Sequence, residues 1–434
     1  MKHIYSIITL SIAAASLPIA ASAEQWSLDS CISYAIEHNI NVRSRALDAT
    51  SADLAVTEAK DQFLPTLNAG ASQSFNFGRG LTSDNTYANR NTSQFGWNVN
   101  LSLPLFQGLS AKRQLDYARA NLSAVLQQVE SAKDDISLQV IAQYLQVLYT
   151  KELHEVAAEQ VRISQVELER RRILLEAGKI AELDLTQAES QLAQDQLTLV
   201  STHNDIRIAL VNLAQMLQLN EVENFDIAPA EETPLILPSP ETVFANALQT
   251  NNSLKASELS IDAADKYVSL ARTGYIPRLS FNAGLGSSYY NIHGFENAPF
   301  HRQMRDNFNK SLGFTLSIPI FDAFQTRNAV RRANVQRLNA ELQYDNVRSN
   351  LFQAIQQAYY QADAAKAKLT AATVARDAAL KAFQAMEEKY NYGRANATEF
   401  EEAKSTYIKA SSEAVQAKYE TLLRLRILRF YNSH

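Results

Sequence analysis

Glycine, proline and cysteine are scarce in this chain of 434 residues, and each scarcity excludes something. The 12 Gly and 10 Pro make up about 5% of residues, against roughly 12% on average, so long uninterrupted elements are expected. A single cysteine, Cys31, excludes a disulfide scaffold. Charged residues are 20% and the net charge is -5, which argues against a polybasic nucleic-acid binder and against a disordered acidic chain.

Long apolar runs are also missing. No segment after the first residues has about 18 consecutive apolar residues, so no transmembrane helix is expected, which leaves a soluble periplasmic or secreted protein or a membrane β-barrel. Residues 1–23 combine Lys2, an apolar stretch at 7–15 and a small-residue ending at 21–23, which is typical of a signal peptide cleaved before Glu24. The alternative, a first transmembrane helix, would need about 20 apolar residues.

The remaining glycines and prolines are clustered, and the segments between the clusters predict helices. The two longest such segments, 109–177 and 323–392, would each be roughly 100 Å long as helices. Shorter helices are expected at 41–62, 182–219, 253–273 and 398–430. These helices predict a mainly α protein.

A seven-residue repeat of apolar positions indicates that these helices pack lengthwise. The series after Gly178 is Leu185, Ala188, Leu192, Asp195, Leu199, Thr202, Ile206, Ala209, Leu213 and Met216. The segment 115–136 has the same spacing. Small and polar members such as Ala188 and Asp195 favour the wall of a many-helix tube over a two-stranded zipper.

Four short segments alternate apolar and small polar residues, which predicts strands. They lie at about 66–78, 94–104, 278–290 and 311–320. Their length and their outer aromatic residues are typical of transmembrane barrel strands, with a soluble hairpin packed on a core as the alternative. Four strands cannot close a barrel, so the chain must oligomerise to insert, and small polar inner faces favour a wet lumen and at least three chains.

The chain is internally duplicated. Pro65 and Pro277, each before a predicted strand, are 212 residues apart, whereas Gly178 and Gly393 are 215 apart because the second hairpin loop is longer. Each copy is a helix-strand-strand-helix-helix unit. The duplication predicts a first repeat at 24–228, a linker at 229–240 and a second repeat at 241–434.

The order of the motifs resembles the TolC-like outer-membrane efflux protein family. The motifs that carry the resemblance are Trp26-Ser27-Leu28-Asp29, Phe63-Leu64-Pro65, Pro104-Leu105-Phe106, Tyr275-Ile276-Pro277, Pro319-Ile320-Phe321 and the two glycine turns. Each motif alone is weak evidence for the family, but their order, which is repeated in both halves of the chain, is specific. The resemblance implies a homotrimer in which each chain contributes four strands to a shared 12-stranded transmembrane β-barrel, continued by a periplasmic tunnel of long coiled-coil-like helices.

The resemblance also implies function, location and partners. It implies a channel in the bacterial outer membrane with a periplasmic extension, working in a tripartite efflux or type I secretion system that exports small molecules or polypeptides. The implied partners are a periplasmic adaptor (membrane fusion) protein, an inner-membrane pump or ABC transporter, and outer-membrane lipid, with no nucleic acid. The alternative is a periplasmic coiled-coil adaptor or scaffold without a membrane barrel.

The two glycine turns are the expected adaptor-docking tips, because family members meet the adaptor there. The residues concerned are Gly178, Lys179 and Ile180 in the first repeat and Gly393, Arg394 and Ala395 in the second. They are expected to lie exposed at the ends of the long helices. The alternative is an ordinary helix C-cap glycine followed by a cation that suits the helix dipole.

Acidic residues shortly after the turns are the expected periplasmic gate. Glu399 and Glu402 follow Gly393 by six and nine residues, and Asp184 follows Gly178 by six. In the resembling family, acids at the two steps of the second repeat form rings that constrict the periplasmic entrance, where like charges raise one another's pKa and attract cations. Helix capping is the alternative, because the segment from Thr398 to Glu401 fits a capping box.

The sequence carries no constellation typical of enzymes. The seven histidines are scattered, without paired Cys/His spacing, so we expect no metal, no cofactor and no catalysis. The segment from Gly284 to Ser287 begins like a dinucleotide fingerprint but lacks its third glycine and its helix. The run Arg170-Arg171-Arg172 is more typical of a solvated helix face than of a binding patch.

Overall fold

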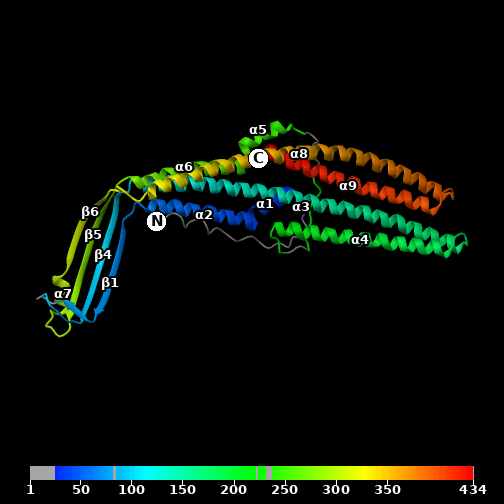
Figure 1. Ribbon diagram of the computed structural model, residues 1–434. Helices are drawn as coiled ribbons and strands as arrows, with labels where there is room; N and C mark the ends of the chain where they lie inside the picture. The colour runs from blue at the N-terminus through cyan, green and yellow to red at the C-terminus, as the bar shows by residue number, and fades with distance from the viewer. Residues whose placement is uncertain (1–24, 82–84, 221–222, 231–236, 434) are drawn as a thin grey trace, which may run out of the picture. The chain divides into compact units, whose positions relative to one another are not determined.

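Four strands form one antiparallel sheet in the computed structural model, which describes residues 25–81, 85–220, 223–230 and 237–433 (Figure 1). The predicted signal peptide at 1–23 lies outside the described residues. The chain divides into two compact units. The first comprises Met1–Asn39, Ser137–Leu235 and Ala364–Leu423, and the second Ile40–Ile136, Ile236–Asp363 and Arg424–His434.

The sheet belongs to the second unit and contains the four predicted strands. In the order β1-β4-β5-β6 they are β1 (Thr66–Asn76), β4 (Thr92–Phe106), β5 (Arg278–Ile292) and β6 (Asn309–Ser317). Strand β6 ends three residues before the predicted 320, because Pro319 has no N–H to donate to a ladder. The sequence did not predict the hairpin of β2 (Arg79–Leu81) and β3 (Tyr87–Asn89), or the short helix α7 (Phe300–Asp306).

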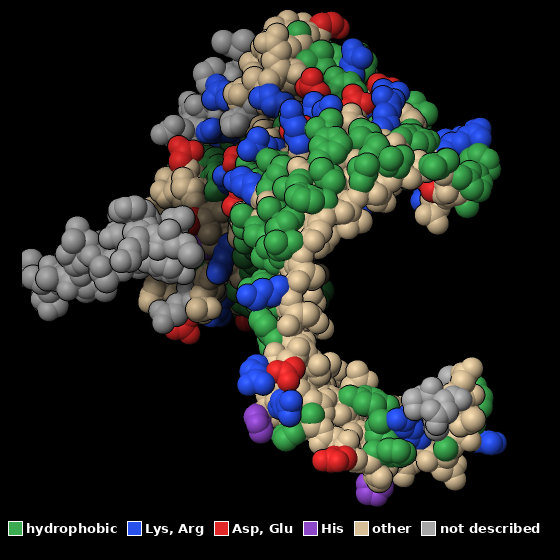
Figure 2. All heavy atoms as spheres, turned by 90° about the vertical axis from the view of Figure 1, so that its left-hand side faces the viewer, with side chains coloured by type: hydrophobic (Ala, Val, Ile, Leu, Met, Phe, Trp, Pro, Cys, Tyr) green, Lys and Arg blue, Asp and Glu red, His purple; other side chains and the backbone are tan. Residues whose placement is uncertain are grey.

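Strand register gives the sheet one apolar and one small polar face. Residues paired across all four strands form an apolar row, Leu67, Leu101, Ala283 and Leu312, and the next level forms a polar row, Asn68, Asn100, Gly284 and Ser311. A Cβ on Gly284 would lie 2.7 Å from Ser311 Oγ, so a larger residue there would require the Ser311 side chain to move. Figure 2 shows hydrophobic side chains along the convex side of the sheet, whereas the concave side shows mostly backbone and side chains that are neither hydrophobic nor charged.

The helices of the second unit continue from the sheet. They are α2 (Ile40–Asp61), the first part of α3 (Ser110–Glu176), α5 (Pro240–Thr250), α6 (Asn252–Ala271) with the turn η1 (Arg272–Tyr275), and the first part of α8 (Gln325–Asn391). Val243 and Leu254 pack with Ile355 and Leu428 in an apolar cluster of this unit. None of the helices in the described part of the chain is long and apolar enough to cross a bilayer.

The first unit is built from two helical hairpins. Helix α4 (Glu182–Met216) returns beside the distal part of α3, and α9 (Ala397–Ser433) returns beside the distal part of α8 (Figure 1). Both long helices have 67 residues, which confirms the length predicted from the missing glycines and prolines. The heptad prediction is confirmed in α4, where Ala188, Asp195, Ala209 and Leu213 are buried.

A polar junction ties the start of the described chain to the segment after α4. Trp26 forms a parallel bridge with Ile227 beside α1 (Leu28–His38), and the Tyr144 hydroxyl, on α3, lies 2.7 Å from the Ala228 carbonyl oxygen. Lys151 forms an ion pair with Asp226. Burial raises the pKa of Asp226, but hydrogen bonds from Lys151 and from the Ile227 amide outweigh it, so this pKa is lowered from its ordinary value of 3.8.

Equivalent caps reveal a further pair of duplicated helices. Ser27 and Ser239 are 212 residues apart, and their hydroxyls accept the N–H groups of residues three further on at 3.2 and 3.3 Å. Helices α1 and α5 begin after these caps, and their C-cap residues, Asn39 and Asn251, have the same spacing. The motif Trp26-Ser27-Leu28-Asp29 predicted a helix opening there, and α1 begins at Leu28, but α5 was not predicted, because an 11-residue helix is too short for the spacing of breakers to reveal. The linker boundaries remain a prediction.

Candidate functional site

Both predicted turns are left-handed glycine caps. The φ angles of Gly178 and Gly393 are +68° and +70°, and a Cβ at either position would meet no atom within 4 Å. The following N–H groups, of Lys179 and Arg394, each donate to a carbonyl five residues earlier at 2.8 Å, as in a Schellman motif. Glycine is therefore required by backbone conformation and not by crowding.

The residues after the glycines differ in exposure. Lys179 and Arg394 are exposed, as expected for docking tips. Ile180 is half-buried, and Ala395 packs against the apolar cluster that contains Phe400. The expectation that all of these residues are exposed is therefore wrong for Ile180 and Ala395, because the chain folds back over the last helical turn after each glycine.

Two of the three expected gate acids act as helix caps. Asp184 Oδ2 accepts the Ala181 N–H at 3.2 Å, and Glu399 Oε2 accepts the Asn396 N–H at 2.8 Å. The Asn396 side chain in turn accepts the Glu399 N–H at 2.9 Å, which completes a reciprocal capping box. The capping-box alternative predicted from Thr398 and Glu401 is thus wrong in position, because α9 begins at Ala397.

Glu402 differs from the two capping acids. It lies on the next turn of α9 and is exposed. Its repeat equivalent, Gln187, is neutral and also exposed. The structure therefore leaves Glu402 free to face solvent or another copy, whereas Asp184 and Glu399 each commit one carboxylate oxygen to a backbone N–H.

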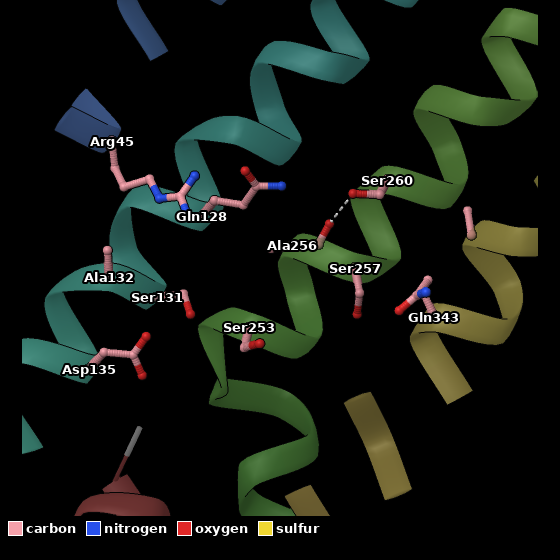
Figure 3. A pocket seen from close by; sticks show the side chains of 11 residues that line it. Arg45, Gln128, Ser131, Ala132, Asp135, Ser253, Ala256, Ser257, Ser260 and Gln343 are labelled. Atoms are coloured by element: carbon pink, nitrogen blue, oxygen red, sulfur yellow. Dashed lines mark hydrogen bonds between the residues drawn. The ribbon is translucent and has the colours of Figure 1, made fainter. Parts of the chain in front are cut away.

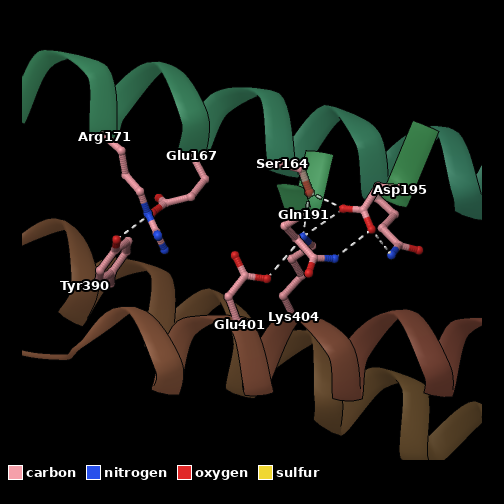
Figure 4. A network of polar contacts seen from close by, with 9 residues as sticks. Ser164, Glu167, Arg171, Gln191, Asp195, Tyr390, Glu401 and Lys404 are labelled. Carbon is pink, nitrogen blue, oxygen red and sulfur yellow. Dashed lines mark hydrogen bonds and ion pairs between the residues drawn. The ribbon is translucent and has the colours of Figure 1, made fainter. Parts of the chain in front are cut away.

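A clamp near the tips joins the two hairpins (Figure 4). Glu167 Oε1 on α3 accepts hydrogen bonds from Arg171 Nε at 2.7 Å and from the Tyr390 hydroxyl of α8 at 2.5 Å. Arg170 lies 3.9 Å from the Tyr390 ring centroid and donates to the Tyr390 carbonyl at 2.6 Å. Burial, with a contribution from Glu167, raises the pKa of Tyr390 to about 12.

The clamp overturns one interpretation of the sequence. The run Arg170-Arg171-Arg172 was expected to be a solvated helix face, but Arg171 is buried and Arg170 half-buried. Arg171 also donates to the Asp184 carbonyl at 2.9 Å and so holds the start of α4. Only Arg172 matches the expectation, because it is exposed and pairs with Glu169 on its own helix. Arg170 bonds to Tyr390, which is 220 residues away, so local sequence could not show that contact, whereas the pairing of Arg171 with Glu167 is a local i,i+4 contact.

A buried ion pair lies further along the same hairpins (Figure 4). Lys404 of α9 and Asp195 of α4 are each 2% exposed, and Lys404 Nζ lies 3.1 Å from Asp195 Oδ2. Lys404 also donates to Ser164 of α3 and, at 3.3 Å, to Glu401. Asp195 accepts further bonds from Ser164, Gln160 and Gln191. All three ammonium protons and both carboxylate oxygens are therefore satisfied.

Sequence reasoning noted Asp195 only as a polar member of a heptad and did not consider Lys404. The available signal was the heptad itself, because a carboxylate on an apolar stripe needs a buried partner. The partner is 209 residues away in the chain, so the sequence could indicate the need and not the identity.

The second unit holds a polar groove of about 540 Å³ (Figure 3). It is lined by Arg45 of α2, by Gln128, Ser131, Ala132 and Asp135 of α3, by serines and Ala256 of α6, and by Ala340 and Gln343 of α8. Burial raises the pKa of Asp135. The lining holds serines but no histidine to activate them. Within the described ranges, no group of three or more His, Cys, Asp or Glu side chains is placed to hold a metal ion.

Comparisons with known proteins agree with this architecture. A family model described as outer membrane efflux protein matches residues 31–218 and 243–431. The outer membrane efflux protein BepC of Brucella suis biovar 1 (strain 1330) is 22% identical over 389 residues, covering 90% of this chain and 81% of that protein. The outer membrane protein TolC of Escherichia coli (strain K12) is 23% identical over 408 residues, covering 89% and 78%.

A solved structure shows the same fold. The crystal structure of the Campylobacter jejuni CmeC outer membrane channel superimposes with a TM-score of 0.79 at 15% sequence identity. The match covers 98% of this chain and 94% of that chain. Long helical hairpins and a four-stranded sheet therefore occur together in both proteins.

Proposed function

Because this chain belongs to the outer membrane efflux protein family, we propose that three copies assemble around one axis and share a single barrel. The chain is an outer-membrane channel of the tripartite efflux or type I secretion kind, and the family is one of transport proteins. The observation that supports a trimer is the four-stranded sheet, which has an apolar outer face and two unclosed edges, at β1 and β6. Leu67 and Leu312 on that face are 67% and 78% exposed, which lipid would cover.

The helical tips are the proposed contact for a periplasmic adaptor protein, which in turn meets an inner-membrane pump or ABC transporter. Lys179 and Arg394 are exposed beside the glycine caps and present one cation at each tip. Gly178 and Gly393 fix the direction of the turns, while Ile180 and Ala395 are half-buried and support them. Acidic or polar side chains of an adaptor hairpin would match these cations.

The proposed entrance gate is acidic. Glu402 is exposed one turn into α9, and three copies would bring three such carboxylates to the periplasmic opening. In Glu399 and Asp184 one carboxylate oxygen accepts the capping N–H and the other does not take part in the cap. Both residues therefore add negative charge while they fix the helix starts. Like charges around a narrow axis repel one another and attract cations, which favours cation binding at the entrance.

Fractionation and cross-linking test the proposal together. We expect the mature chain to sediment with outer membranes, to require detergent for extraction, and to give a cross-linked trimer in that detergent. In planar bilayers the trimer should open a conducting pore. Release by salt or osmotic shock without detergent would instead indicate a periplasmic coiled-coil scaffold, and a monomer as the only cross-linked species would contradict the shared barrel.

A further inference from the structure

One edge of β5 is completed by side chains and not by a strand. Strand β5 has 15 residues and β6 only nine, and their pairing stops at Gly286 opposite Asn309. Beyond that level the backbone of β5 still needs partners on the side where β6 would continue. The segment between the two strands, which includes α7, supplies them.

Three amide side chains form this edge. Gln303 of α7 accepts the Tyr290 N–H and donates to the Tyr290 carbonyl, both at 3.0 Å. Asn297 does the same with Ile292 at 3.0 and 2.9 Å. Asn307 donates to the Ser288 carbonyl at 2.7 Å. The segment from Asn297 to Asn307, which contains α7, is therefore anchored on alternate residues of the strand.

Aromatic contacts place α7 against the apolar face of the sheet. Phe300 packs 5.8 Å from Phe95 and 5.2 Å from Tyr289, ring centroid to centroid. Ser287, which shares that face, is buried and donates to the Met304 carbonyl at 2.7 Å. In the proposed barrel this face meets lipid. Because the helices α3 and α8 continue from the opposite end of the strands, α7 lies at the end that faces the cell exterior.

Cations gather at the same place. Arg302 and Arg305 of α7 are 65% and 77% exposed, and they share one carboxylate, Asp306, at 3.6 and 2.9 Å. Lys310 is the outermost residue of a row on β6 that continues with Leu312, Phe314 and Leu316. Its ammonium lies 5.6 Å from the ring of Phe308, which packs against Trp97.

A cation at the outer end of a lipid-facing row meets a particular environment. Aromatic side chains of barrels lie at the membrane interface, where headgroups begin. A long basic side chain at that level extends along apolar surface and puts its charge among the headgroups. Guanidinium groups bind phosphate oxygens in pairs, and lysine binds them as a point charge. One shared carboxylate leaves this cluster a net positive charge.

We propose that Arg302, Arg305 and Lys310 bind the phosphate groups of the glycolipid, lipopolysaccharide, that forms the outer leaflet of the outer membrane. Helix α7 is a docking element whose amide anchors hold the arginines at headgroup level. The inference rests on the proposed barrel, which puts the apolar face of the sheet in lipid. It adds a specific lipid contact to that proposal.

The test uses the full chain, extracted as the trimer, freed of lipid by detergent exchange and titrated with bisphosphorylated lipid A. The test variant replaces the rim cations in Arg302→Gln, Arg305→Gln and Lys310→Gln together. The control makes the same charge change at exposed residues of α8 and α9, in Arg348→Gln, Lys381→Gln and Lys409→Gln. We expect the affinity for lipid A to fall roughly fivefold per charge removed at the rim and to change less than about twofold in the control.

Further binding measurements identify which group of the lipid the cations bind. Dephosphorylated lipid A should bind wild type as weakly as the rim variant does, and inorganic phosphate at millimolar concentration should not compete. An Arg302→Lys, Arg305→Lys variant, which keeps the charge, should bind within about threefold of wild type. This variant separates loss of charge from damage to α7.

Three outcomes would overturn the inference. They are unchanged lipid A affinity in the rim variant, loss of the trimer by that variant with lipid A binding intact, and competition by inorganic phosphate. The second outcome would make the cluster a contact between copies, and the third a site for free anions. Failure of the wild type to fractionate with outer membranes would reject the barrel itself, before any lipid is added.

Discussion

Lys404 Nζ lies 3.1 Å from Asp195 Oδ2 at a point where both residues are 2% exposed. The pair links the return helices of the two repeats, and Ser164 of α3 bonds to both members. Burying two charges costs about as much as their attraction returns, so such a pair contributes little net stability. Its effect is on specificity, because any shift of α9 along α4 would separate the two buried charges from each other.

Breaking the pair from one side should be far more damaging than removing it. We expect Lys404→Met to destabilise the protein by about 3–5 kcal/mol, since Asp195 would remain buried and charged. The double variant Lys404→Met, Asp195→Leu should regain most of that loss. Thermal unfolding followed by circular dichroism in detergent measures both, with Lys409→Met on the exposed face of α9 as the control. Equal losses in the single and double variants would contradict this account.

The Tyr390 hydroxyl should matter most in the range between neutral and alkaline pH. Tyr390→Phe removes one hydrogen bond to Glu167 and should cost about 1–2 kcal/mol at pH 7. Burial raises the pKa of Tyr390 to about 12, from an ordinary value of 10.0, so the folded state favours the protonated phenol. This stabilisation is complete below pH 10 and is lost as the pH rises through about 12.

The measurement is the helical signal against pH for both proteins. Wild type and Tyr390→Phe should differ at pH 7 to 9 and converge toward pH 12. Tyr392→Phe is the matched control, because Tyr392 lies two residues further on and is 79% exposed. A constant difference across the whole range would show that the hydroxyl proton plays no part.

The ion pair of Asp226 with Lys151 should fail in acid. Because the pKa of Asp226 is lowered from 3.8, its stabilisation is fully present above about pH 5 and disappears as the pH falls below 3.8. Asp226→Asn should therefore cost about 1 kcal/mol at neutral pH, a small value because both side chains are partly exposed, and progressively less as the pH falls below 3.8. Melting temperatures at several pH values decide this, with the exposed Glu223→Gln as control.

Substitutions of Glu399 and Glu402 should have different effects, the first on stability and the second on cation block of the channel. Glu399→Ala removes half of a capping box and should lower stability by about 1 kcal/mol. Glu402→Ala should leave the melting temperature unchanged and weaken the block of single-channel current by divalent cations. Both variants are measured in planar bilayers and by thermal unfolding. If Glu402→Ala conducts and is blocked like wild type, Glu402 does not line the entrance.

Sequence patterns predicted the elements whose signal is local. The long helices follow from missing glycine and proline over 110–176 and 325–391, and the strands from a period of two. The sequence did not predict helix α7, because its seven residues are held by the bond of Gln303 to β5 and by the ring packing of Phe300. Neither contact produces a periodic pattern in the sequence.

The candidate site was predictable in place but not in its internal contacts. The spacing of Gly178 and Gly393 located the tips, and the residues after them named the acids. The bonds of Glu167 to Tyr390 and of Asp195 to Lys404 join positions more than 200 residues apart, so no local pattern encodes them. The duplication does indicate which residues have equivalent roles in the two repeats, since Asp184 and Glu399 cap equivalent helices.

In the proposed trimer, the side-chain edge on β5 would set the stagger between neighbouring chains. Because Gln303 and Asn297 already occupy the backbone of Tyr290 and Ile292, an incoming strand cannot extend along β5 beyond the end of β6. The β1 strand of another copy finds unpaired backbone on this side only along the nine residues of β6. In the proposed barrel this would block strand slippage between subunits toward the rim, so that each chain would determine the strand tilt of the closed barrel before the chains assemble.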